Sequence, residues 1–230
     1  MQTLIGTSGY SYTPWKGRFY PSDLPAKKML PYYAGQFATV ELNNTFYKMP
    51  TAKQVETWAA EVPASFRFAI KAPQAITHWL RLKDAGEALT ELWTSIDALG
   101  KKEGPVLFQL PPNMKKDVGL LRAFVSLLPR RSGATFEFRH DSWFGDDVYA
   151  ALGDGGAALC IADAEKLTTP VIATVDWGYL RLRREDYAKA DIRRWAKQIG
   201  KQKWKRAFIY FKHEDTAKGP AFAQLLMESM

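Results

Sequence analysis

Charged and amide side chains recur at a spacing of two residues in several short runs of the sequence. Glu41 stands two residues before Asn43, and Glu137 stands two residues before Arg139. Residues two apart on a β-strand share one face of the sheet. Burying charges on such a face for stability alone is unfavourable, because a desolvated ion pair roughly breaks even at best. We therefore interpret these runs as strands that present a catalytic or ligand-binding face.

The same interpretation extends to other expected strand ends. Lys71 and the pair Arg181 and Arg183 repeat the alternation of polar with apolar residues. Carboxylates and imidazoles exchange protons, whereas cationic and amide groups stabilise developing negative charge and orient a substrate. The catalytic candidates are Glu41, Glu137, Asp163, His78 and His213. The ligand-binding candidates are Asn43, Lys71, Gln109, Arg139, Arg181 and Arg183.

Two alternatives to this catalytic interpretation stay open. The polar residues could form internal salt bridges that fill a lumen without chemistry. Glu41, Glu137 and Asp163 could instead hold Mg²⁺ or Mn²⁺ through oxygen, although nothing in the sequence requires a cofactor. The spacing of the three histidines and of the one cysteine, Cys160, matches no zinc motif.

Basic residues indicate an anionic partner. The chain has a formal net charge of +8, and Arg181, Arg183, Arg184 and Lys212 cluster at the expected ends of two strands, where guanidinium groups match phosphate or carboxylate oxygens. A second basic stretch, residues 193–206, reads as a solvated helix face. Because Trp204 lies among its lysines, nucleic-acid binding is the alternative.

Eight strand-like runs alternate with helical patterns along the chain. Capping signals support the helices, such as Thr51 with Gln54, which form a capping box. The expected strands are Thr3–Gly6, Thr39–Asn43, Phe66–Lys71, Val106–Leu110, Ala134–Arg139, Ala157–Ala162, Gly178–Arg183 and Arg206–Phe211. This order predicts an α/β fold, a (β/α)8 TIM-barrel-like domain whose strands place catalytic groups at their C-terminal ends. One irregular connection is expected near 163–178, where Thr168, Thr169 and Pro170 interrupt any helix.

Length and composition agree with one domain. The 230 residues are 47% apolar and 24% charged, which excludes a disordered chain. No run approaches the ~18 apolar residues of a membrane span, and the N-terminus has no secretory leader. We therefore expect a single domain over residues 1–230, cytoplasmic and without a membrane partner. The oligomeric state stays open.

Several motifs together resemble the domain of unknown function 72, or YecE-like, family. They include the runs 6–21, 39–47, 71–78, 107–112 and 137–143, and the resemblance covers essentially the whole chain. It implies a TIM-barrel-like fold and no particular reaction. Where Arg183 and Arg184 stand, the family commonly has histidine and glycine, so the site of this chain is more basic. His213 could then be the polar group of this subgroup at the eighth strand.

The leading hypothesis is an enzyme, with hydrolysis as one reaction class, that acts on a small anionic, phosphorylated or carboxylated ligand at the C-terminal mouth of a barrel. Glu41 or Glu137 would be general base or metal ligand, and His213 or His78 general acid. A nucleic-acid-associated protein or nuclease that uses residues 193–206 is one alternative. A non-catalytic metabolite-binding module is the other.

Overall fold

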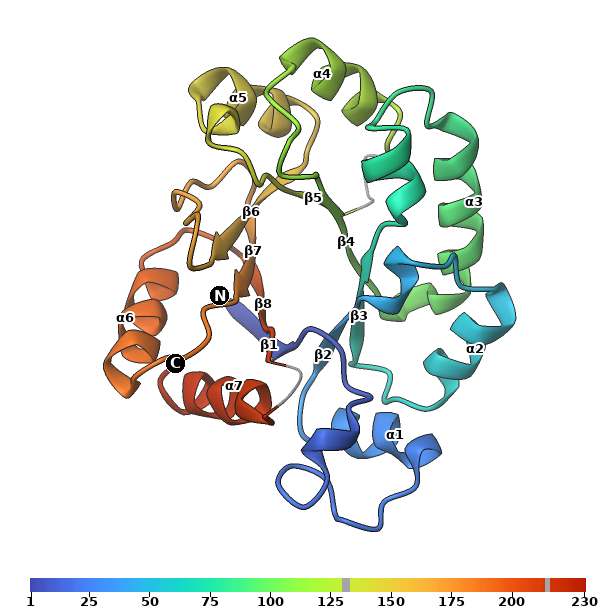
Figure 1. Ribbon diagram of the computed structural model, residues 1–230, viewed down its shortest axis with the longest axis vertical. Helices are drawn as coiled ribbons and strands as arrows, with labels where there is room; N and C mark the ends of the chain where they lie inside the picture. The colour runs from blue at the N-terminus through green and yellow to red at the C-terminus, as the bar shows by residue number, and fades with distance from the viewer. Residues whose placement is uncertain (130–132, 214–215) are drawn as a thin grey trace.

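The computed structural model of the chain describes residues 1–129, 133–213 and 216–230. Eight parallel strands surround a common axis, and helices cover the outside of the ring (Figure 1). The strands are β1 (Gln2–Thr7), β2 (Thr39–Leu42), β3 (Arg67–Lys71), β4 (Glu103–Gln109), β5 (Ala134–Glu137), β6 (Ala158–Asp163), β7 (Trp177–Leu182) and β8 (Arg206–Phe211). The predicted (β/α)8 barrel is confirmed, as is each of its eight strands to within a few residues.

The described residues form seven α-helices, six in connections between strands and the last one after β8. They are α1 (Met29–Ala34), α2 (Ala52–Ala60), α3 (Gly86–Ile96), α4 (Val118–Ser126), α5 (Asp146–Asp154), α6 (Lys189–Gly200) and α7 (Lys218–Glu228). Shorter 3-10 segments are Thr13–Trp15, Ala26–Lys28, Asn44–Phe46, Asp97–Lys102 and Asp141–Trp143, and Ala75–Trp79 forms a π-helical turn.

Local signals in the sequence act as expected at two connections. The Thr51 hydroxyl accepts a hydrogen bond from the Gln54 amide, and the Gln54 side chain accepts one from the Thr51 amide, so the capping box opens α2. Between β6 and β7 the chain forms no helix, and a single antiparallel bridge joins Asp163 to Thr168. The predicted irregular connection is therefore confirmed.

β1 and β2 are the first and last strands in the order of the sheet, and side-chain hydrogen bonds help to close the barrel between them. The Tyr33 hydroxyl accepts a hydrogen bond from the Thr7 amide at 2.8 Å and donates one to the Thr39 carbonyl at 3.0 Å. Gly6 permits this close approach, because a Cβ there would lie 2.1 Å from the Thr39 carbonyl oxygen. A parallel bridge between Ser8 and Glu41 continues the closure towards the C-terminal ends of these strands.

The two faces of the strands are buried in different places. Outward residues such as Val40, Leu42, Phe136 and Phe138 pack in the large apolar core between strands and helices. A smaller apolar cluster consists of Leu4, Ala69, Leu107, Cys160, Tyr179, Phe208 and Tyr210. These seven residues alternate with outward ones, so they fill the middle of the lumen. The apolar outer faces of the strands therefore meet the helices, whereas the lumen is apolar in its middle and charged towards the C-terminal ends of the strands.

In the described part of the chain, no helix has both the length and the apolar character that crossing a bilayer requires.

Candidate functional site

A buried arginine lies between two buried glutamates at the C-terminal end of the barrel. Arg181, on β7, is 1% exposed, and its Nη2 donates to Glu41 Oε1 at 2.8 Å. Its Nη1 donates to Glu137 Oε2 at 2.5 Å. The glutamates come from β2 and β5, so one guanidinium joins three strands across the lumen. These are three of the residues that their two-residue spacing singled out.

Glu137 also receives hydrogen bonds from other predicted ligand-binding residues. Its Oε1 accepts one from Gln109 Nε2 at 2.8 Å and one from Arg183 Nη1 at 3.2 Å. The Nε atom of Arg139 lies 3.8 Å from the same oxygen, and the Arg139 side chain is 37% exposed. Around Glu137 the network therefore extends from a fully buried cation towards a solvent-accessible one.

Glu41 is held by two residues that the sequence analysis missed. Its Oε1 accepts a hydrogen bond from Ser8 Oγ at 2.7 Å, and its Oε2 accepts one from Tyr179 OH at 2.6 Å. Tyr179 stands two residues before Arg181 on β7, and Ser8 follows β1 in the phase of Leu4. The same two-residue spacing rule could have found both.

Burial and charge oppose each other at the two carboxylates. Burial alone would raise the pKa of Glu41, but the charge of Arg181 and hydrogen bonds from Tyr179 and Ser8 outweigh it, so the pKa lies below its usual value. At Glu137 burial is likewise overcome, chiefly by Arg181 and Arg183, and the pKa falls to about 2. Both side chains are therefore ionised at neutral pH.

Lys71 at the end of β3 has different surroundings. Its ammonium nitrogen lies 3.9 Å from the centroid of the Phe46 ring, and the side chain is half-buried. Burial, together with the charge of Arg181, lowers the pKa of Lys71 to about 7. His78 packs edge-on against Phe46 with ring centroids 5.0 Å apart, and burial and the charge of Lys71 lower the pKa of this imidazole.

Several buried side-chain nitrogens near the strand ends have no hydrogen-bond partner in the described part of the chain. Two of them are Nδ2 of Asn43, which follows β2, and Nε of Arg183, which follows β7. Both atoms are buried. Because a buried donor without an acceptor is unfavourable, each such group calls for an explanation, of which a ligand is one.

Two predicted catalytic residues lie outside this network. Asp163 ends β6, and its Oδ2 accepts a hydrogen bond from Trp195 Nε1 on α6 at 3.0 Å and lies 3.2 Å from Arg184 Nε. The Nε2 atom of His213 lies 2.7 Å from the Arg184 carbonyl oxygen, and its ring packs on Phe222. Burial lowers the pKa of His213. Asp163 and Arg184 therefore face α6, so the expected basic cluster around Arg181 divides.

The three carboxylates considered for a metal ion are not brought together. Arg181 stands between Glu41 and Glu137, and Asp163 contacts Trp195 on the outer side. Across residues 1–129, 133–213 and 216–230, no group of three or more His, Cys, Asp or Glu side chains is placed to hold a metal ion.

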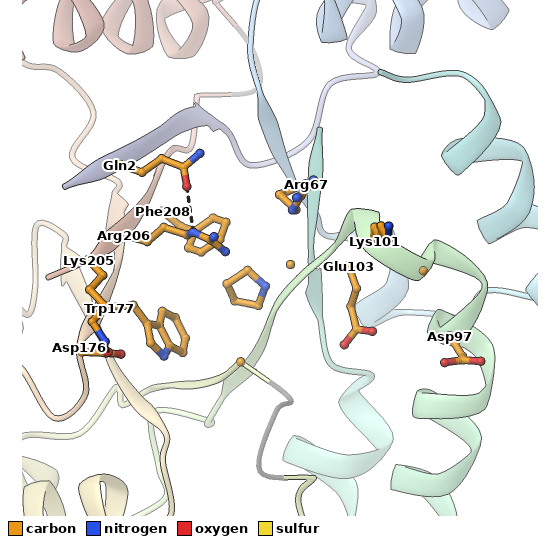
Figure 2. A pocket seen from close by; sticks show the side chains of 14 residues that line it. Gln2, Arg67, Asp97, Lys101, Glu103, Asp176, Trp177, Lys205, Arg206 and Phe208 are labelled. Carbon is orange, nitrogen blue, oxygen red and sulfur yellow. Dashed lines mark hydrogen bonds and ion pairs between the residues drawn. The ribbon is translucent and has the colours of Figure 1, made fainter. Parts of the chain in front are cut away.

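A cavity of about 760 Å³ opens at the other end of the barrel, where the strands begin. Figure 2 shows Trp177 and Phe208 among its walls, with Arg206 and Lys205 beside them and Arg67 across the cavity. Barrel enzymes place their reacting groups at the C-terminal ends of the strands. In this chain the buried charge network and this cavity therefore lie at opposite ends.

The basic stretch 193–206 does not present an aromatic surface. Trp204 is 4% exposed and packs beside Gly178, where a Cβ would come within 2.6 Å of the indole. Lys205 pairs with Asp176 at 2.7 Å, and Arg194 pairs with Asp191 at 2.6 Å. Trp204, the aromatic residue on which the nucleic-acid alternative depended, is thus part of the core.

Sequence comparisons identify relatives of this chain. A family model described as "Protein of unknown function DUF72" matches residues 4–230. The UPF0759 protein YunF of Bacillus subtilis is 31% identical over 139 residues, which are 56% of this chain and 49% of the relative. The match therefore spans about half the length of that curated relative.

Solved structures share the fold over nearly the whole chain. The crystal structure of a DUF72 family protein from Thermotoga maritima has a TM-score of 0.90 at 25% identity, covering 99% of this chain and 98% of that one. A DUF72 family protein from Enterococcus faecalis has a TM-score of 0.82 at 18% identity, covering 99% of this chain and 95% of that one. At 18% identity, the similarity to the Enterococcus faecalis protein shows a shared fold and nothing further.

Proposed function

Because this chain belongs to the DUF72 family, whose description names no reaction, we propose its function from the chemistry of the barrel lumen. The protein is an enzyme that binds a small anionic ligand, phosphorylated or carboxylated, at the C-terminal ends of the strands. There it carries out acid–base chemistry on that ligand.

An excess of positive charge carries this proposal. Four basic side chains, those of Arg181, Arg183, Arg139 and Lys71, surround only two carboxylates, Glu41 and Glu137. The carboxylates neutralise the buried Arg181 and hold it in place. Arg183 and the more exposed Arg139 then remain to attract an anion, and guanidinium groups suit phosphate and carboxylate oxygens.

The uncommitted donors support the same ligand class. The unpartnered Nδ2 of Asn43 and Nε of Arg183 can donate to anion oxygens. Gln109 keeps the Glu137 carboxylate oriented, so it positions Arg183 as well as contributing to the site. The two glutamates act as fixed counterions in this proposal, because their oxygens already accept hydrogen bonds and they stay ionised at neutral pH.

Lys71 and His78 supply the acid–base groups. The pKa of Lys71 falls to about 7, and a group with a pKa near the working pH exchanges protons most effectively. The pKa of His78 is lowered from its ordinary value, so its imidazole is neutral at pH 7 and can accept a proton. Hydrolysis is one reaction class within this proposal, and Lys71 is the base that it would use. Asp163 and His213, which face outward, have no part in it.

Titration calorimetry with inorganic phosphate and with oxalate tests the proposal. We expect Arg183→Gln and Arg139→Gln to weaken binding about tenfold each, which corresponds to about 1.4 kcal/mol for one charge-assisted contact. Arg206→Gln, a matched loss of one arginine at the other end of the barrel, should leave binding unchanged. Equal losses in all three variants, or no binding to the wild type, would contradict an anion site at this end.

A further inference from the structure

Lys71 is a lysine without an acidic partner in a region that contains two carboxylates. Its nitrogen lies over the Phe46 ring at 3.9 Å, and in the described part of the chain it forms no ion pair. Glu41 and Glu137 are occupied by Arg181, which lies between them. The amine is thus held by an aromatic face at the mouth of the barrel while the nearby anionic groups are taken.

A half-buried amine without an ion pair, close to a buried guanidinium, is suited to act as a nucleophile. A lysine is a weak nucleophile while protonated, and it is activated by desolvation or by a neighbouring cation. Burial is the larger cause at Lys71 and Arg181 the second, and together they lower the pKa to about 7. At pH 7 a larger fraction of this amine is therefore unprotonated than in an ordinary lysine.

We propose that Lys71 forms an imine with the carbonyl carbon of an anionic substrate, a 2-oxo acid or a phosphorylated aldehyde or ketone. This inference rests on the proposed anion site, since Arg183 and Arg139 would hold the anionic group. It replaces the role of Lys71 as general base by that of nucleophile, and it defines the substrate class by its carbonyl group.

The chemical step balances without an oxidant or a reductant. The lone pair of the neutral amine adds to the carbonyl carbon, and the electrons of the C=O π bond move to oxygen. A proton passes from nitrogen to that oxygen, and the hydroxyl group then leaves as water when the C=N bond forms. His78, which packs edge-on against Phe46, is placed to relay protons between the nitrogen and the departing oxygen.

Reductive trapping tests the imine directly. The full chain is incubated with pyruvate and sodium cyanoborohydride at pH 7, and peptide mass spectrometry measures the adduct at every lysine. We expect Lys71 to be modified at least tenfold more than the median lysine. The modification should rise with pH around a midpoint near 7, because only the free amine reacts.

Variants and a matched probe serve as controls. Lys71→Arg keeps the charge and should lose the preferential adduct, whereas Lys205→Met, which removes an exposed lysine at the opposite end, should keep it. Methyl pyruvate carries a similar carbonyl without the negative charge and should label Lys71 about tenfold less. Because the wild-type labelling pattern needs no variant, a folding defect in Lys71→Arg does not prevent the test.

The outcomes separate this inference from the proposed function. Uniform labelling of lysines, together with phosphate binding that depends on Arg183, would overturn the imine and leave the anion site intact. Preferential labelling of Lys71 by both probes, unchanged in Arg183→Gln, would support the nucleophile but contradict the anion site. Absence of both labelling preference and anion binding would overturn both.

Discussion

The two ends of the barrel contain the same kinds of ion pair in opposite surroundings. At the N-terminal end Lys205 and Asp176 lie 2.7 Å apart with side chains 83% and 59% exposed. At the C-terminal end Arg181 and Glu41 lie 2.8 Å apart with side chains 1% and 0% exposed. Water screens the first pair, whereas the second has lost its hydration and depends wholly on its protein partners.

The same difference separates the cavity from the buried charges. The cavity at the N-terminal end (Figure 2) is open and bordered by charges that solvent can satisfy. The network at the C-terminal end has strongly shifted pKa values, and such shifts cluster at functional sites. The proposed site therefore follows the burial of charge and not the cavity, and this contrast between the two ends can be measured.

The largest effect is expected from Arg181→Met. Removal of the guanidinium leaves Glu41 and Glu137 as buried carboxylates without their main counterion, so the free energy of unfolding should fall by about 3–5 kcal/mol. Urea denaturation at pH 7 measures it, and failure to fold would be the extreme form of the same result. Arg206→Gln at the N-terminal end should change stability by no more than about 0.5 kcal/mol. Similar losses in both variants would remove the contrast between the ends.

Acid should lower the free energy of unfolding through the protonation of Glu137. Its pKa is about 2 in the folded protein and near 4.5 when unfolded, so the unfolded chain takes up the proton first as pH falls. Stability should therefore be lost between about pH 4.5 and 2, by roughly 3 kcal/mol. In Glu137→Gln this part of the acid slope should vanish from urea midpoints measured over that window. Asp176→Asn, at an exposed carboxylate, should change the pH dependence of stability much less. An equal change in both variants would contradict the idea that burial makes Glu137 the main acid-sensitive group.

Rising pH should stabilise the protein through Lys71 as well, in a higher pH range. The folded pKa of about 7 lies below the ordinary value of 10.5, so the unfolded chain binds more protons between these values. Wild-type stability should therefore gain on the order of 1–2 kcal/mol between pH 7 and 9 relative to Lys71→Met, with allowance for partial exposure. Lys205→Met should show no such relative change over this range. If the free energy of unfolding of Lys71→Met followed that of the wild type at every pH, the amine would titrate like an ordinary lysine in solvent.

The smallest effect is expected at the exposed pair. Lys205→Met removes the contact with Asp176 and should lower the free energy of unfolding by no more than about 1 kcal/mol. The remaining effect should weaken further in 0.5 M salt, because ions screen exposed charges. A loss comparable to that of Arg181→Met would show that exposure is a poor measure of the difference between the two ends.

Periodicity in the sequence sufficed for the fold and for the centre of the site. Alternation at two-residue spacing placed Glu41, Glu137 and Arg181 on inward faces, and both faces of a parallel barrel strand are buried in predictable ways. The same rule extended to Tyr179 would have completed the hydrogen bonds of Glu41. It could not find Phe46, which lies in a 3-10 segment, where side-chain direction has no period of two.

The same alternation accounts for the predicted residues that lie outside the lumen. Asp163, the last residue of β6, shares the outward phase of Ile161, and Arg184 keeps the outward phase of β7, so both face α6. His213 keeps the outward phase of β8 and packs on α7 through Phe222. These residues were singled out by their chemistry and their place at strand ends, and their phase on the strand already directed them away from the lumen.

The sequence by itself determined the order of the elements, the inward position of the lumen charges and the excess of basic groups, because all three follow from local period and composition. Only the tertiary structure decided which charges pair. Glu41 and Arg181 are 140 residues apart along the chain, and closure of the barrel brings them within hydrogen-bond distance. That pairing occupies the carboxylates and leaves Lys71 over the Phe46 ring, with no ion pair among the described residues. Ionisation depends on burial and on neighbours across the barrel, and neither quantity is encoded in the spacing of residues along one strand.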